Sequence, residues 1–247
     1  TDCMKRLLIL GCLFNFIGNS FYVYAQSKEV TTQEQTWLSI NSTVKLHKNW
    51  GFIADAHIRR TDFFAQSNFY FLRGAINYWV SPDLTVALGY AHMWIAPTNS
   101  STFLNENRIY QQVQLVSRTN HVSIVQRLRS EQRWSEKIVQ NKKSDTLNFT
   151  ERIRYLLSVT IPIFKNKQLP SLVISDEICL QFGKKIVYNT FDQNRLFIGI
   201  KQILSKALSF DAGYMYLYQQ KESGYQYNGN KTYRLFLYYT PDLSKHN

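Results

Sequence analysis

The chain has 247 residues, and its 29 lysines and arginines outnumber its 17 aspartates and glutamates, giving a formal net charge of +12 at pH 7. The basic residues recur singly along the chain instead of forming one run, which argues against nucleic acid as a partner. Beyond the first 25 residues no apolar run reaches the roughly 18 residues of a membrane-spanning helix. The composition therefore argues against both a nucleic-acid-binding protein and a helical membrane protein.

The start of the chain is typical of a secretory signal peptide. Two basic residues precede an apolar stretch that ends near Ala25, where the residues permit cleavage. Met4 is the expected start of translation, with residues 1–3 upstream of it. We therefore divide the chain into a signal peptide, residues 1–25, and one exported domain, residues 26–247.

From about Gln35 onward, polar and apolar residues alternate, as in half-buried strands, and a helical period is almost absent. Most of the alternating segments have about 10 to 16 residues, which suits a tilted crossing of a membrane. Eleven such segments are recognisable, at residues 36–46, 50–60, 69–80, 84–95, 107–117, 121–134, 146–161, 171–183, 193–204, 207–219 and 231–240.

The connections between these segments alternate in length. Short polar links such as 47–49 and 81–83 are separated by longer ones such as 61–68, 97–106 and 135–145. Outer-membrane barrels have short periplasmic turns and longer external loops, whereas Greek-key sandwiches have no such alternation. We therefore expect an all-β fold, a single antiparallel transmembrane β-barrel of about 10 to 12 strands. A soluble all-β protein with a solvated polar face is the alternative.

The number of strands is less clear than the architecture. Bacterial single-chain barrels normally have an even number of strands, and eleven segments ending in a periplasmic C-terminus would start the first strand outside the cell. Either residues 26–34 supply a weak twelfth strand, or one segment lies outside the barrel and leaves ten. Twelve strands is the preferred prediction.

Charged residues stand at every second position of the segment QRLRSEQRW, residues 126–134. Arg127, Arg129, Glu131 and Arg133 share one face because successive side chains of a strand point to opposite sides. If the apolar faces meet lipid, this charged face lines the lumen. We expect the segment to form part of an internal charge network.

The same reasoning assigns charged residues of other segments to the lumen. Barrels of this size enclose little room, so these side chains are expected to form ion pairs, with Glu131 and Glu177 each contacting several arginines. The network either fills and stiffens the barrel or lines a narrow pore that favours anions. Its predicted members are Arg108, Arg127, Arg129, Glu131, Arg133, Arg152, Arg154, Glu177, Arg195 and Arg234, and further candidates for the lumen are Asp55, His57, Arg59, Arg73, Lys201 and Asp211.

Several motifs together carry a resemblance to a known family. RIYQQVQL, QRLRSEQRW, RIRYLLSVTIPI, SDEICLQF, FDQNRLFIGI and LSFDAGYMYLYQQ occur in the order and spacing of the domain-of-unknown-function family 2490. The resemblance extends from about Trp37 to Tyr239. It implies an outer-membrane barrel of unassigned role from Gram-negative Bacteroidota, and it supplies no catalytic residues.

One short motif supports an enzymatic alternative. Several outer-membrane lipid hydrolases use a His-x-Ser pair on a strand, in which the histidine takes the serine proton, and His121 and Ser123 have this spacing. The asparagine that usually follows is missing, and the pair adjoins a short turn that is expected in the periplasm. We therefore predict that the protein is not an enzyme, with the hydrolase as an alternative.

The sequence indicates no cofactor and no metal site. His47, His57 and His92 fall on different segments without the spacing of metal ligands. After signal cleavage only Cys179 remains, so no intrachain disulfide is expected. Outer-membrane lipid and lipopolysaccharide are the expected surroundings, and the longer loops are candidates for binding a protein partner at the surface.

Overall fold

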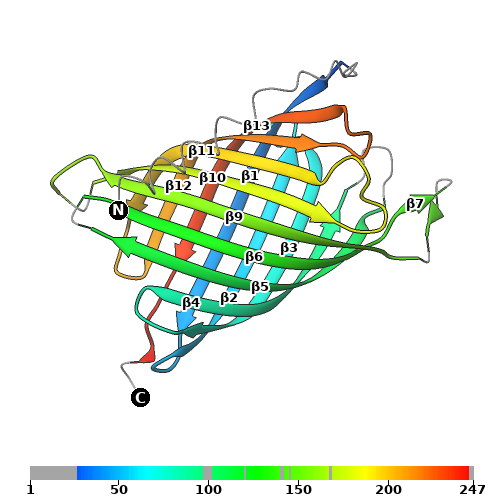
Figure 1. Cartoon of the computed structure of the whole chain (residues 1–247). Coiled ribbons are helices and arrows are strands. Elements are labelled where there is room, and N and C mark those ends of the chain that lie inside the picture. The colour runs from blue at the N-terminus through cyan, green and yellow to red at the C-terminus, as the bar shows by residue number, and fades with distance from the viewer. Residues whose placement is uncertain are drawn as a thin grey trace, which may run out of the picture.

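The computed structural model describes residues 27–96, 102–119, 121–139, 142–144, 146–166 and 169–244, and the predicted signal peptide lies outside them. Eleven strands close into a barrel, and two short strands, β7 and β8, form a separate hairpin (Figure 1). No helix among the described residues is long and apolar enough to cross a membrane. The strands are β1 (Glu29–Lys45), β2 (Trp50–Thr61), β3 (Gln66–Trp79), β4 (Leu84–Ile95), β5 (Leu104–Arg118), β6 (Ser123–Ser135), β7 (Ile138–Val139), β8 (Lys142–Lys143), β9 (Asn148–Pro162), β10 (Ser171–Phe182), β11 (Phe191–Ile203), β12 (Leu208–Gln220) and β13 (Gln226–Tyr239).

Neighbouring barrel strands are antiparallel except at the closure, where β1 pairs with β13 in parallel. An odd number of strands requires one parallel pair, because the first and last strands then run in the same direction. The all-β closed barrel and a strand number within the predicted range are confirmed. The preferred number of twelve is corrected to eleven within the described residues, because residues 29–34 continue β1 along β13 and do not form a strand of their own.

The barrel is apolar outside and charged inside. Along β11, Leu196 and Ile198 are each 52% exposed, while the intervening Phe197 is 1% exposed and faces the lumen. A soluble protein rarely exposes so large a contiguous apolar surface. Each barrel strand contributes an exposed large hydrophobic residue, for example Ile40, Phe52, Leu72, Leu88, Ile109, Leu128, Ile153, Ile174, Leu196, Tyr214 and Leu235.

The connections gather at two ends of the barrel. We call the end with the β1–β2, β3–β4, β5–β6, β9–β10 and β11–β12 links the short-turn end, and the opposite end the long-loop end. The β7–β8 hairpin projects from the long-loop end (Figure 1). The β2–β3 link at that end is shorter than expected, because Asp62 and Phe63 adopt left-handed backbone conformations, with φ of 50° and 61°, that turn the chain tightly.

Candidate functional site: the charged lumen

One cavity of about 850 Å³ lies inside the barrel. Its lining includes Asn68 and Ala96 at the long-loop end and Asp83 and Arg118 at the short-turn end. Twelve basic and seven acidic side chains line the cavity, which leaves five positive charges without an acidic counterpart in the lining. The lining of the cavity is therefore positively charged.

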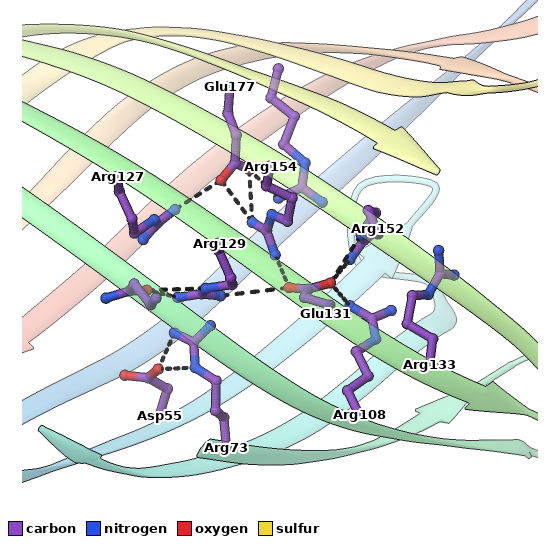
Figure 2. Close-up of polar contacts among 12 residues, drawn as sticks. Asp55, Arg73, Arg108, Arg127, Arg129, Glu131, Arg133, Arg152, Arg154 and Glu177 are labelled. Carbon is purple, nitrogen blue, oxygen red and sulfur yellow. Dashed lines mark hydrogen bonds and ion pairs between the residues drawn. The ribbon is translucent and has the colours of Figure 1, made fainter. Parts of the chain in front are cut away.

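Glu131 on β6 is the carboxylate with the most arginine partners (Figure 2). Its Oε2 accepts hydrogen bonds from Arg152 at 2.5 Å and from Arg108 at 3.2 Å. Its Oε1 accepts one from Arg154 at 2.7 Å, and Arg129 lies 3.7 Å away as a fourth ion-pair partner. Glu131 is 3% exposed, so these contacts compensate a carboxylate that has lost its water.

Glu177 on β10 forms a second centre of the network. It accepts hydrogen bonds from Arg127, Arg154 and Arg195, each at 2.8 Å. Arg154 contacts both Glu177 and Glu131, so a single guanidinium joins the two centres (Figure 2). This geometry connects the lumen faces of β6, β9, β10 and β11.

Two further carboxylates of the network were missed by sequence reasoning. Glu106 contacts Arg108 and accepts a hydrogen bond from Arg133 at 3.1 Å, and Asp192 accepts one from Arg152 at 2.9 Å. Both had been assigned to long connections, whereas β5 and β11 begin earlier and include them. Glu106 lies two residues before Arg108 and therefore on the same face of the strand. This spacing could have identified Glu106 as a lumen residue.

We call the lumen face of β5, β6, β9 and β10 the arginine wall. Nine of the ten predicted network residues form one connected set of ion pairs, which reaches Arg195 on β11. Arg234 on β13 stands apart and pairs with Asp211 at 2.8 Å, where Tyr238 also donates a hydrogen bond. The arginine wall is defined by Glu106, Arg108, Arg127, Arg129, Glu131, Arg133, Arg152, Arg154 and Glu177.

Aromatic side chains cover another part of the lumen, on β1, β2, β3, β11 and β13. This aromatic wall consists of Trp37, His57, Phe69, Phe71, Phe197 and Phe236. The order of strands around the barrel places β1, β2 and β13 across from β6 and β9, whereas β11 neighbours β10 of the arginine wall. Sequence reasoning did not single out Phe69 and Phe71, which share the strand face of Arg73 and could have been assigned inward by the same alternation.

Arginines on the aromatic wall stack on rings. The Arg59 guanidinium lies 3.5 Å from the Trp37 ring and 4.4 Å from the Phe69 ring, because Arg59 is the register partner of both residues. Arg234 lies 3.7 Å from the Phe197 ring. Such cation–π contacts hold a guanidinium by its face and leave its N–H edge for other partners.

The His-x-Ser pair lies away from the lumen network. His121 is exposed in the β5–β6 turn at the short-turn end, and Ser123 is the first residue of β6. In the described part of the chain no hydrogen bond joins the His121 side chain to Ser123. His47, His57 and His92 lie apart, and the described residues contain no group of three or more His, Cys, Asp or Glu arranged to hold a metal.

The fold and the lumen together define a closed β-barrel with an apolar exterior and a charged interior. The sequence matches the family described as "Protein of unknown function (DUF2490)" over residues 34–228, and the chain belongs to this family. The predicted resemblance is thus confirmed at the level of the family, and the bacterial group that it implies stays a prediction.

Comparisons with individual proteins add little. The curated proteins contain no match to the chain. Among solved structures, the siderophore receptor PirA from Pseudomonas aeruginosa is similar, with a TM-score of 0.35 and 12% identity, over 71% of this chain and 33% of that receptor. The chain therefore spans about a third of the receptor's length.

Proposed function

We propose that the chain is an outer-membrane β-barrel whose lumen forms a narrow passage that favours anions. The apolar belt around all eleven strands supports a membrane environment, because a belt of this kind is stable only in contact with lipid or another apolar surface. The short turns then face the periplasm and the longer loops face outward, as in other barrels of this type.

The excess of five positive charges in the cavity lining is the observation that carries the preference for anions. Arginine and lysine side chains around a pore lower the barrier for anions and raise it for cations. The side chains of the arginine wall line the cavity (Figure 2), so the proposed passage is narrow. Lining residues at both ends support a passage that connects the two sides of the membrane.

The test is to reconstitute the folded barrel in planar lipid bilayers and to measure the reversal potential in a KCl gradient. We expect currents whose reversal potential has the sign for chloride. In the variant Arg129→Ala, conductance should rise and the preference for chloride should fall. This variant is informative because Glu131 retains Arg108, Arg152 and Arg154 when Arg129 is removed.

Lys231→Ala is the matched control, because Lys231 carries the same charge but stands exposed on the outer face of β13. Its currents should equal those of the unaltered protein. Folding is verified by a shift in gel mobility between boiled and unboiled samples of isolated outer membranes. A folded barrel without currents, or with a cation preference, would reject the passage and leave the network as a structural element.

The long-loop end favours a second candidate function, binding of a partner at the cell surface. Val187 and Tyr188 in the β10–β11 connection are 67% and 71% exposed, and Phe63 in the β2–β3 turn is 62% exposed. Exposed apolar side chains on loops are frequent in protein interfaces. Cross-linking in intact cells tests this candidate: a protein that is captured by the unaltered barrel and lost in the double variant Val187→Ser, Tyr188→Ser supports it.

A further inference from the structure

Arg59 is a lumen arginine without an acidic partner. Within the described residues it forms no ion pair, and its buried Nε has no hydrogen-bond acceptor. Desolvation and the positive charges of Arg195, Arg154 and Arg108 disfavour the charge of Arg59. A half-buried cation in such surroundings is costly unless an anion compensates it. The charge of Arg59 would therefore be compensated by a negative group that the described residues do not supply.

The rings around Arg59 hold its guanidinium in place. Trp37 and Phe69 contact it at 3.5 Å and 4.4 Å, measured to the ring centroids. These contacts fix the plane of the guanidinium and leave its N–H groups directed along that plane. A planar fork of this kind matches the two oxygens of a carboxylate.

An apolar surface adjoins this cation. Phe69 and Phe71 pack with Ala91 and Met93 into a buried cluster, and all four line the cavity. His57 stacks on Phe71 with centroids 4.0 Å apart, and neither of its ring nitrogens has a hydrogen-bond partner among the described residues. A ligand at Arg59 thus meets a positive charge on one side and hydrocarbon on the other.

Arg195 is a second cation beside the Trp37 ring. Arg195 lies 5.3 Å from the Trp37 ring and is held by Glu177, so it marks where the arginine wall meets the aromatic wall. Its Nε is also buried without a partner. Arg59 and Arg195 therefore flank Trp37 from β2 and β11 and present two cations to one anionic group.

We propose that the lumen binds a small carboxylate carried on an aromatic or other flat apolar ring. The carboxylate lies at Arg59, with Arg195 as the second cation, and the ring lies against Phe69, Phe71 and Met93. This inference deepens the proposed function and rests on it for the access of anions to the lumen. An inorganic anion would contact only the charged half of this site, whereas a carboxylate on a ring would contact both halves.

Titration calorimetry on the folded, detergent-solubilised barrel tests the proposal with benzoate as the probe. Acetate supplies the carboxylate without the ring, benzyl alcohol the ring without the charge, and benzylammonium the ring with the opposite charge. We expect benzoate to bind at least about tenfold more tightly than each of the three, because only benzoate engages both halves of the site. Equal affinities of benzoate and acetate would overturn the apolar half of the proposal.

Variants of Arg59 separate a binding role from a structural one. Arg59→Gln should weaken benzoate binding about tenfold or more, while the barrel stays folded with an unchanged or higher midpoint of thermal unfolding, since it loses an uncompensated charge. Arg59→Lys keeps the charge without the planar fork, so its affinity should be intermediate. Lys231→Gln, on the exposed outer face of β13, is the control and should bind like the unaltered protein.

The outcomes distinguish this site from the proposed passage. Unchanged benzoate affinity in Arg59→Gln, or a lower unfolding midpoint without loss of binding, would overturn the site and make Arg59 structural. Chloride-selective currents without any benzoate binding would reject the site and leave the passage intact. Benzoate binding lost in Arg59→Gln, in a barrel that carries no current, would support the site and reject the passage.

Discussion

The arginine wall and the aromatic wall both hold arginines that face the lumen, but they compensate the charge in different ways. On the arginine wall, carboxylates such as Glu131 and Glu177 occupy the N–H groups of their partners. On the aromatic wall, Trp37 and Phe69 contact the face of Arg59 and leave its N–H groups unoccupied by any described residue. Ion pairing consumes the directional bonds of a guanidinium, whereas stacking preserves them.

This difference divides the lumen into a part whose guanidinium groups are paired with carboxylates and a part whose guanidinium groups can still bind an anion. Arg154 is held by Glu131 and Glu177 together, so an external anion at this guanidinium would have to compete with two carboxylates. Arg59 loses no protein contact when an anion binds to its edge. The arginine wall is therefore suited to holding four strands in register, and the aromatic wall is suited to binding.

The largest expected effect comes from breaking the arginine wall at its centre. Glu131→Gln removes the charge that faces four arginines, so we expect the free energy of unfolding to fall by about 3–5 kcal/mol. Urea unfolding of the barrel in lipid vesicles, followed by tryptophan fluorescence, measures this change. The control Glu151→Gln alters an exposed carboxylate of β9 and should change stability by less than about 0.5 kcal/mol. Similar midpoints for the two variants would contradict the central role of Glu131.

A smaller loss of stability is expected when a side chain is added at Gly89, beside the Tyr110 ring. A Cβ at Gly89 would lie 2.5 Å from the Tyr110 ring and 2.6 Å from Ala75 Cβ, so Gly89→Ala forces the ring aside. We expect a loss of about 1–3 kcal/mol in the same unfolding assay. Gly74→Ala is the control, because its new methyl group meets only the end of the Phe52 side chain, at 3.2 Å. A control variant as unstable as Gly89→Ala would refute this packing.

The stacking on the aromatic wall should contribute less than the ion pairs. Phe197→Leu removes the ring that lies 3.7 Å from the Arg234 guanidinium, while Asp211 keeps its contact with Arg234. The expected loss is about 1 kcal/mol, within the usual range for cation–π contacts. Phe52→Leu, on the exposed outer face, serves as the comparison. A loss of unfolding free energy in Phe197→Leu as large as that in Glu131→Gln would contradict the weaker contribution of stacking.

The smallest expected effect is on the β7–β8 hairpin, outside the barrel wall, whose local stability should depend on pH. The backbone N–H of Asn105 donates a hydrogen bond to Glu136 at 2.8 Å, and this holds the pKa of that carboxyl below its usual range. A lowered pKa stabilises the fold above the unfolded pKa, and this stabilisation is lost as pH falls through the folded pKa. Lys143 on β8 is its ion-pair partner at 3.0 Å.

Hydrogen exchange of the β7–β8 hairpin should therefore accelerate, relative to the barrel strands, between about pH 6 and about pH 3. The rate must be corrected for the intrinsic effect of pH on exchange. In Glu136→Gln the corrected rate should be high at both pH values, because the charge that holds Lys143 is absent. A hairpin whose exchange is independent of pH in the unaltered protein would contradict the contribution of Glu136.

The alternation of polar and apolar residues was sufficient by itself to predict an all-β protein. It also predicted which face of each strand is charged. The segment 84–95 was predicted with the bounds that β4 has in the structure, because a period of two depends only on neighbouring residues. The same local rule placed Arg129 and Arg154 on charged faces. Aromatic residues such as Phe69 were not identified as part of the lumen, because an aromatic ring has only a weak preference for either environment.

Only the tertiary structure decided which charges meet. Glu131 contacts Arg152 because the register of β6 against β9 places the two residues opposite each other, and no local pattern fixes that register. The parallel closure of β1 on β13 likewise depends on the whole circle of strands. Arg59 remains without a carboxylate for the same reason: periodicity assigns a side chain to the lumen, whereas strand order and register assign its neighbours.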